Sequence, residues 1–189
     1  MAEDVRIIKN KRVIENAIIL LLQRKEFSKI TIQDICQEAL VSRSTFYAHY
    51  LDKYDLLEKI VDKYFSVLQE LIASRFSTVE LINIDAIFLL LSQTYSQYKE
   101  IFSVLMKVHV PGSDFREKIE NTLFSYCIQF LEATSKQYKM PNELIAKLYV
   151  ANVITIIDWT LEKGIDEKII ESLSRLQSTV FHLIEKDEI

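Results

Sequence analysis

The residues best suited to chemistry lie between positions 42 and 50, which read Ser-Arg-Ser-Thr-Phe-Tyr-Ala-His-Tyr. In a helix, Phe46 and Tyr50 share one face, because residues four apart lie on the same side. The remaining large side chains carry a cation, a hydroxyl, a phenol and an imidazole: Arg43, Thr45, Tyr47 and His49. These groups suit phosphate oxygens and base edges in a DNA groove. They equally suit a solvent-exposed helix face with a half-buried Tyr47, so their chemistry alone leaves both interpretations open.

The spacing of apolar residues predicts the helices that must position this stretch. A first helix is expected over 13–22, and a short second helix begins after Thr31, which with Asp34 has the spacing of a capping box. Ser42 opens a third helix that extends to about residue 50. Only two residues separate the second and third helices, so the two must cross steeply, as in a helix-turn-helix. When that motif reads DNA, its second helix enters the major groove.

A fourth helix is expected after Asp52, which can cap it, and runs without a breaker to about residue 76. Lys53 at its start can add a phosphate contact. The chain is expected to continue as helical blocks over 80–97, 99–109, 114–139, 143–163 and 166–186. We therefore expect a helix-turn-helix domain over residues 1–52 and a second helical domain over 53–189.

The scarcity of glycine and proline supports an all-α fold. The 189 residues include two of each, where average usage gives roughly 13 Gly and 9 Pro. Glycine-rich phosphate-binding loops and nucleophile elbows need glycines at short spacing, and this chain has none so placed. Strand-rich sandwiches and barrels are disfavoured because their tight turns need the same residues.

The charge is distributed unevenly along the chain. Its net charge is −4, but residues 1–60 carry ten basic and nine acidic residues, against 13 and 18 in the remainder. The N-terminal third is therefore the relatively basic part, and nucleic-acid binding is expected there if anywhere.

No metal or cofactor is expected. The bundle-type Glu-x-x-His ligand spacing is absent, the three histidines lie in different segments, and Cys36 and Cys127 have no ligand at a useful spacing. A helical-bundle enzyme that uses scattered carboxylates remains an alternative that nothing favours. Two isolated cysteines suit a reducing cytoplasm. The longest apolar runs are six residues, so no membrane span is expected.

Residues 9–60 resemble the DNA-binding domain of the TetR family of bacterial transcriptional regulators. The family pattern S-R-x-T-F-Y-x-H-F followed by x-D-K-x-x-L-L stands here as residues 42–57, with Tyr50 in place of the last Phe. The second-helix sequence 31–35 also agrees. Many members have glycine at the positions of Glu26 and Leu40, where a positive φ is easiest for glycine. Leu40 therefore implies either strain or a different turn geometry.

The resemblance also implies roles for individual residues. Backbone phosphates are the expected partners of Tyr47, His49 and Lys53, whereas Arg43 and Thr45 are expected to touch bases or phosphates. Thr31 is expected to cap the second helix against the DNA backbone. The complete predicted DNA-binding set is Thr31, Ser42, Arg43, Ser44, Thr45, Tyr47, His49 and Lys53.

The last two helices are expected to form a homodimer interface. The block 143–163 is apolar nearly all round, and residues in the last block recur at spacings of three and four, which indicates a seam that needs a partner helix. TetR-family proteins dimerise through their last two long helices. The predicted interface residues are Leu148, Ile156, Ile169, Leu173, Leu176, Val180 and Leu183. The alternative is that both apolar faces are covered within one chain.

A ligand pocket is expected between helices of the second domain, since apolar walls with a few polar groups are typical of such sites. The predicted lining is Phe102, Met106, His109, Tyr126, Phe130, Tyr149 and Trp159. The alternative is that these residues are simply core, and that His109 lies at a helix end.

The resulting expectation is a cytoplasmic, dimeric repressor that an effector releases from a palindromic operator on double-stranded DNA. The alternative is a TetR-like coactivator controlled by a protein partner. The segments 27–31, 98–102 and 114–118 resemble a subgroup that includes regulators of dihydroxyacetone kinase operons, in which the control is by a protein.

Overall fold

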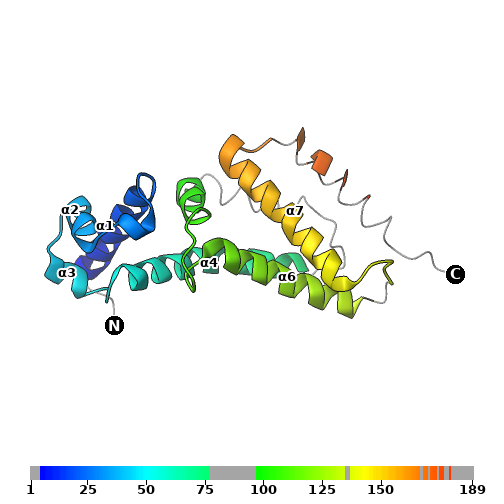
Figure 1. Ribbon diagram of the computed structural model, residues 1–189, viewed down its shortest axis with the longest axis horizontal. Coiled ribbons are helices and arrows are strands. Elements are labelled where there is room, and N and C mark those ends of the chain that lie inside the picture. The colour runs from blue at the N-terminus through cyan, green and yellow to red at the C-terminus, as the bar shows by residue number, and fades with distance from the viewer. Residues whose placement is uncertain are drawn as a thin grey trace. The chain divides into compact units, whose positions relative to one another are not determined.

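The described part of the chain is built from helices. The computed structural model describes residues 5–76, 97–134, 137–166, 168–169, 171–173, 175–176 and 179 (Figure 1). Over this part of the chain the fold is all-α, as predicted. The elements are α1 (Val5–Leu22), the 3₁₀ helix η1 (Phe27–Lys29), α2 (Ile32–Ala39), α3 (Arg43–Tyr47), α4 (Lys53–Phe76), α6 (Phe115–Ala133) and α7 (Asn142–Lys163). Residues 97–105 are also helical.

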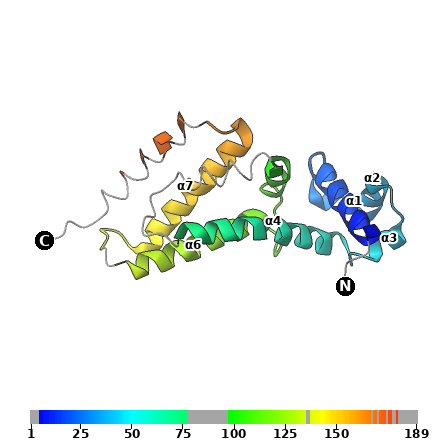
Figure 2. The same ribbon diagram turned by 180° about the vertical axis from the view of Figure 1, so that it is seen from behind.

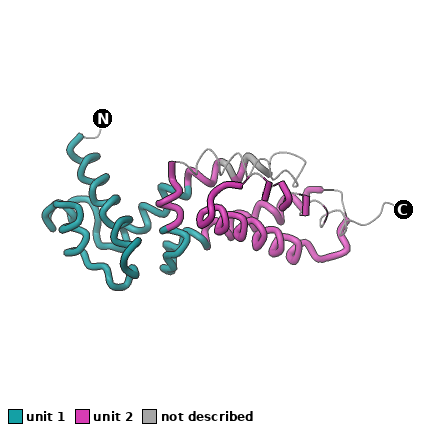
Figure 3. Tube along the Cα trace, turned by 90° about the horizontal axis from the view of Figure 1, so that it is seen from above, with its two compact units in different colours: residues 1–65, 104–116 teal, residues 66–103, 117–189 magenta. Residues whose placement is uncertain are grey.

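The chain divides into two compact units (Figure 3). Unit 1 is Met1–Phe65 with Val104–Arg116, and unit 2 is Ser66–Ser103 with Glu117–Ile189. The single helix α4 continues from unit 1 into unit 2. These units group residues by proximity, so the functional boundary predicted after residue 52 stays a prediction.

The core of unit 1 fixes α1, α2 and α3 around one another. The three helices lie side by side in both views (Figures 1 and 2). Their buried side chains include Ile14 and Ile18 of α1, Ile35 of α2 and Phe46 of α3, each at most 1% exposed. Phe46 and Tyr50 are both buried, which confirms the inward face predicted for the third helix.

Two helix bounds in unit 1 differ from the prediction. α1 begins at Val5, not Val13, because the chain has no breaker there. Its first turns leave Val5 and Ile8 exposed, so no buried face marked them in the sequence. α3 ends at Tyr47, not Tyr50, because the amides of His49 and Tyr50 both donate to the Phe46 carbonyl in a tightened turn.

Unit 2 contains the long apolar helix α7, whose bounds agree with the predicted block 143–163 within one residue. Gly164 ends it at φ 95°, and its amide donates to the Thr160 carbonyl at 2.9 Å. Among the described residues, α7 alone has the length and composition of a membrane-crossing helix, and it buries part of that surface within the chain.

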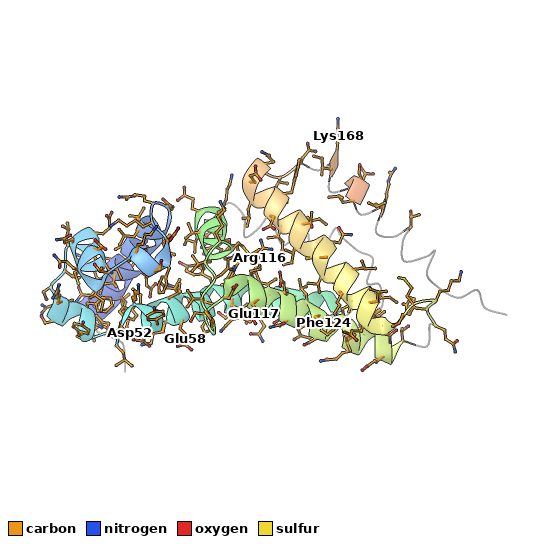
Figure 4. All side chains as sticks on the ribbon, in the orientation of Figure 1. Asp52, Glu58, Arg116, Glu117, Phe124 and Lys168 are labelled. Atoms are coloured by element: carbon orange, nitrogen blue, oxygen red, sulfur yellow. The ribbon has the colours of Figure 1, made fainter. Side chains whose placement is uncertain are left out.

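Other predicted blocks fit less closely or lie outside the described residues. The helix expected over 99–109 spans 97–105, and the one expected over 114–139 is α6 (Figure 4). The predicted helix 80–97 lies almost wholly outside the described residues. The same holds for 180–186 at the end of the last predicted block.

Candidate nucleic-acid interface

The first turn of α2 is held by the predicted capping box. The Asp34 amide donates to Thr31 Oγ1 at 3.1 Å, and the Thr31 amide and hydroxyl both donate to Asp34 Oδ2 at 2.9 Å. These donors hold the pKa of the Asp34 carboxyl below its ordinary value. Because its amide and hydroxyl are both engaged in this box, Thr31 fixes the first turn of α2.

The turn between α2 and α3 has the left-handed geometry that favours glycine. Leu40 lies at φ 55°, ψ 40°, and its side chain is 93% exposed. The strained alternative raised by the sequence is therefore the one adopted, at a cost of about 1–2 kcal/mol. Glu26, the other position where relatives often have glycine, has φ −62° and carries no such strain.

Ser42 begins α3 as a helix cap. The Thr45 amide donates to Ser42 Oγ at 3.1 Å. The same oxygen lies 2.7 Å from Ser44 Oγ and 2.9 Å from Thr45 Oγ1. Three hydroxyls are thus gathered at the start of α3, which confirms the predicted beginning of this helix.

The solvent side of α3 presents the predicted polar residues. Tyr47 is 55% exposed and is braced edge-on by the buried Phe46 ring, with 5.6 Å between centroids. Arg43 is exposed, and its Nη2 donates to Gln33 Oε1 on α2 at 2.9 Å. His49 lies partly exposed just beyond α3. α2 and α3 therefore present a phenol, a guanidinium, an amide and hydroxyls together.

Asp52 caps α4 as predicted and stands at the junction between α3 and α4 (Figure 4). The amides of Tyr54 and Asp55 donate to Asp52 Oδ1, both at 2.8 Å. Asp55 Oδ2 in turn accepts from the Leu51 amide and from Lys59 Nζ. The Lys59 hydrogen bond and then the Leu51 amide hold the pKa of the Asp55 carboxyl below its ordinary value.

The Glu15 carboxylate on α1 contacts both Tyr50, which follows α3, and Lys63 of α4. Tyr50 Oη donates to Glu15 Oε1 at 3.2 Å, and Lys63 Nζ lies 2.7 Å from Glu15 Oε2. Burial, and then the Glu15 charge, raise the pKa of Tyr50 above its ordinary value. Tyrosine at this position, where the family pattern has phenylalanine, supplies the hydroxyl for this bond.

Lys53 lies at the start of α4 but points back across unit 1. Its Nζ donates to the carbonyl oxygens of Phe27 at 2.9 Å, Ser28 at 3.2 Å and Ile30 at 2.8 Å. The sequence predicts a phosphate contact for Lys53, whereas in this structure its ammonium contacts the loop between α1 and α2.

Four residues were not assigned a role from the sequence: Gln33, Glu15, Lys59 and Lys63. Gln33 had a local signal, since it is exposed on α2 within the stretch 31–35 that agrees with the family pattern. Lys59 pairs with Asp55 four residues earlier, a spacing that the sequence does show. Glu15 contacts Tyr50 and Lys63, which lie far away in the chain, and no spacing rule indicates such pairs.

The structure places the predicted pocket residues in different settings. Phe102, Met106 and Tyr149 are buried, Tyr126 and Phe130 are partly exposed, and Trp159 is 46% exposed. His109 is exposed, and its Nδ1 lies 2.8 Å from Asp114 Oδ2 within unit 1. Met106 and His109 belong to unit 1 and the others to unit 2. The pocket stays a prediction.

The predicted interface residues also differ in exposure. Leu148 and Leu176 are more than half exposed, Ile169 and Leu173 are partly exposed, and Ile156 is buried within unit 2 at 2% exposure. Ile156 therefore packs in the chain's own core. Val180 and Leu183 lie outside the described residues.

The segment that builds this interface also matches known regulators. A family model described as "Bacterial regulatory proteins, tetR family" matches residues 15–60, which run from α1 into α4. An uncharacterised HTH-type transcriptional regulator, YxbF, from Bacillus subtilis is 30% identical over 61 residues, covering 32% of this chain and 16% of YxbF. The chain thus spans much less than two thirds of the length of that relative.

Solved structures extend the likeness to the whole chain. A TetR transcriptional regulator from Streptococcus agalactiae is 25% identical, with a TM-score of 0.63 and 97% of both chains covered. The dihydroxyacetone kinase operon activator DhaS is 18% identical, with a TM-score of 0.55, covering 94% of this chain and 98% of its own; this likeness shows the fold alone. The subgroup resemblance therefore stays a prediction.

The fold and the helix-turn-helix are those of transcription regulators. Residues 15–60 match the DNA-binding segment of the TetR family of bacterial regulators, and the fold of the chain is that of a TetR regulator.

Proposed function

We propose that this protein is a dimeric, operator-binding repressor whose α3 enters the major groove of double-stranded DNA. The single observation that carries the proposal is the exposed face of α2 and α3, where Tyr47, Arg43 and the hydroxyls at the start of α3 stand together on a buried Phe46 base. Hydroxyl, phenol and guanidinium donors are the groups that bind phosphates and base edges.

The proposed contacts divide into two kinds. Tyr47 and His49 are assigned to phosphates, with Ser42 and Ser44 beside them, because these groups carry hydroxyl or ring N–H donors. Thr31, whose hydroxyl donates to Asp34, is assigned a place beside the DNA backbone as the cap of α2. Arg43 and Thr45 are assigned to base edges, because an arginine fork fits the two acceptors of guanine and a threonine methyl fits thymine.

Dimerisation follows from the architecture of the family and from the geometry of DNA. Two recognition helices placed about 34 Å apart meet successive major grooves on one side of the duplex. We assign the contact between protomers to α7 and the residues that follow it, where Leu148 and Leu176 are exposed. The protein would act in the cytoplasm, where its operator is.

Release by an effector is proposed to act through α4. This helix runs unbroken from unit 1 into unit 2. An effector that prefers one orientation of α4 would change the spacing of the two recognition helices, with a coupling of about 1–3 kcal/mol. The effector site is assigned to unit 2.

Selection of DNA from a random pool by the purified protein tests the proposal. The expected result is an enriched inverted repeat with half-sites about one helical turn apart, and loss of that enrichment when Tyr47 is replaced by Ala. No enrichment at low ionic strength, with the protein folded, would contradict it.

A further inference from the structure

The Glu15 carboxylate joins parts of unit 1 that are distant in the sequence. Its Oε1 accepts from Tyr50 Oη at 3.2 Å, and its Oε2 lies 2.7 Å from Lys63 Nζ, so its two partners are 35 and 48 residues away. The Glu15 side chain is 18% exposed and Tyr50 is 3% exposed. Because salt screens a partly buried charge less than an exposed one, these contacts act at ordinary ionic strength. We call the two contacts the Glu15 bridge.

The Tyr50 hydroxyl is not needed to fill the core of unit 1. Phe46, which packs beside it, is fully buried without a hydroxyl, and the family pattern has phenylalanine at position 50. A buried hydroxyl that lacks a partner is costly, so a tyrosine here requires an acceptor. Glu15 supplies that acceptor from α1. The bridge therefore consists of matched residues on separate elements.

The Tyr50 ring supports the residues that are assigned to phosphates. Its centroid lies 5.7 Å from that of Phe46, and the Phe46 ring braces Tyr47 edge-on at 5.6 Å. The His49 ring lies 6.4 Å from the Tyr50 ring. Tyr47 and His49 thus lie next to a pair of aromatic rings, one of which is fixed at its hydroxyl by Glu15.

A second lysine of α4 contacts the same tyrosine. Lys59 Nζ lies 5.3 Å from the centroid of the Tyr50 ring, within the range of a cation–π contact. Lys59 and Lys63 are four residues apart, so they lie on the same side of α4. That side of the helix therefore reaches Tyr50 twice, directly through Lys59 and through Glu15 by way of Lys63.

We propose that Glu15 is a positioning residue, which fixes the recognition segment, residues 42–50, against α4 so that Tyr47 and His49 are presented to DNA in one arrangement. The inference rests on the proposed function, because the segment that Glu15 positions is the DNA-reading one. Fixing this segment before DNA arrives lowers the conformational entropy that binding costs.

Charge alone predicts the opposite effect of removing Glu15. A carboxylate in the DNA-binding unit repels phosphates, so its removal raises the affinity for DNA of any sequence. Loss of the bridge leaves the recognition segment less firmly held and lowers the affinity. The sign of the change in affinity therefore separates a positioning role from a purely electrostatic one.

The test compares four variants of the full-length protein. Tyr50→Phe removes the hydroxyl and keeps the ring, Glu15→Ala removes the carboxylate, and a third variant combines both changes. Glu38→Ala is the matched control, because it removes a carboxylate that pairs with Arg24 at 3.4 Å and lies on α2, outside the recognition segment and α4.

Two quantities are measured for each variant. The first is the affinity for the DNA fragment enriched from the random pool, at a temperature where circular dichroism shows every variant to be folded. The second is amide hydrogen exchange over residues 43–50 of the free protein. The affinity under these conditions reports how the folded protein presents its DNA-binding residues, which a loss of stability alone does not change.

The bridge predicts that Tyr50→Phe and Glu15→Ala each weaken DNA binding roughly three- to tenfold, the effect of one lost hydrogen bond. Exchange over 43–50 should be faster in both. The combined variant should bind no more weakly than Glu15→Ala, because the hydroxyl has already lost its acceptor there. Glu38→Ala should bind at least as tightly as the unaltered protein, with unchanged exchange.

Two results would overturn the proposal. One is an affinity that rises in Glu15→Ala as it does in Glu38→Ala and is unchanged in Tyr50→Phe. The other is exchange over 43–50 that is the same in all variants.

The exchange measurement also distinguishes this inference from the proposed function. If the unaltered protein binds no DNA, the proposed function fails, while faster exchange over 43–50 in Tyr50→Phe and Glu15→Ala still supports the bridge. If the protein binds DNA and these two variants match Glu38→Ala in both affinity and exchange, the bridge fails alone.

Discussion

At the scale of single residues, base reading depends on how far the Arg43 guanidinium is held in one orientation before DNA binds. An exposed arginine side chain has many rotamers, and binding must fix one of them at a cost of roughly 1–2 kcal/mol. The 2.9 Å bond from Arg43 to Gln33 on the neighbouring helix reduces this freedom before DNA arrives. It also leaves the Gln33 amide nitrogen as a donor beside the guanidinium.

We therefore predict that Arg43→Ala relaxes base preference, and that Gln33→Ala relaxes it at the same base pair. The loss of one arginine–guanine pair corresponds to about 1–3 kcal/mol of discrimination, or roughly 5–150-fold. Selection from a random pool with each variant measures this. Tyr47→Phe is the comparison, since a lost phosphate hydrogen bond weakens binding to every sequence alike. If Arg43→Ala does the same, Arg43 contacts a phosphate and reads no base.

At the scale of elements, the caps were predictable and the long-range ties were not. Thr31 with Asp34, Ser42, and Asp52 act on amides two or three residues away, so their spacing alone indicated the starts of α2, α3 and α4. Lys53 reaches a loop more than 20 residues back. Such a contact depends on how elements pack, which no local pattern encodes.

The spacing of apolar residues predicted the bounds of a helix better where the helix has a buried face than where its turns are exposed. α4 and α7 have apolar residues along most of their length, and their bounds agree within about one residue with the prediction. The first two turns of α1 present exposed Val5 and Ile8, so the expected start at residue 13 was wrong. An exposed turn lacks the burial signal that periodicity detects.

The turn between α2 and α3 provides a stability prediction. Leu40→Gly removes a Cβ from a left-handed residue, which relieves about 1–2 kcal/mol of strain and costs about 0.5–1 kcal/mol in chain entropy. Because the Leu40 side chain is almost fully exposed, little packing is lost. We expect a net gain of up to about 1.5 kcal/mol in the free energy of unfolding, measured by urea titration at constant slope. Leu40→Ala keeps the Cβ, and an equal gain there would show that strain is not the cause.

At the scale of the whole molecule, the relevant question is which surface holds two copies together. On α7, Leu144, Leu148 and Trp159 remain about half exposed, and with Ala151 and Thr155 they recur at spacings of four, three, four and four. Residues at these intervals form one stripe along a helix. Ile156 and Val153 lie on the opposite, buried side, so one face of α7 serves the chain's own core and the other is available to a second copy.

We predict that Leu148→Glu combined with Trp159→Glu yields a folded monomer at micromolar concentration in sedimentation experiments, because two charges then stand in an apolar contact. Affinity for the full palindrome should fall by about 100-fold or more, since two linked half-site readers gain roughly 10²–10⁴ over one. Affinity for a single half-site should be unchanged. Leu20→Glu, at an exposed leucine of α1 in unit 1, is the control and should leave the dimer intact. Helix content and half-site binding together check that each protomer of the double variant is folded. If the folded double variant still sediments as a dimer, the interface does not include this stripe.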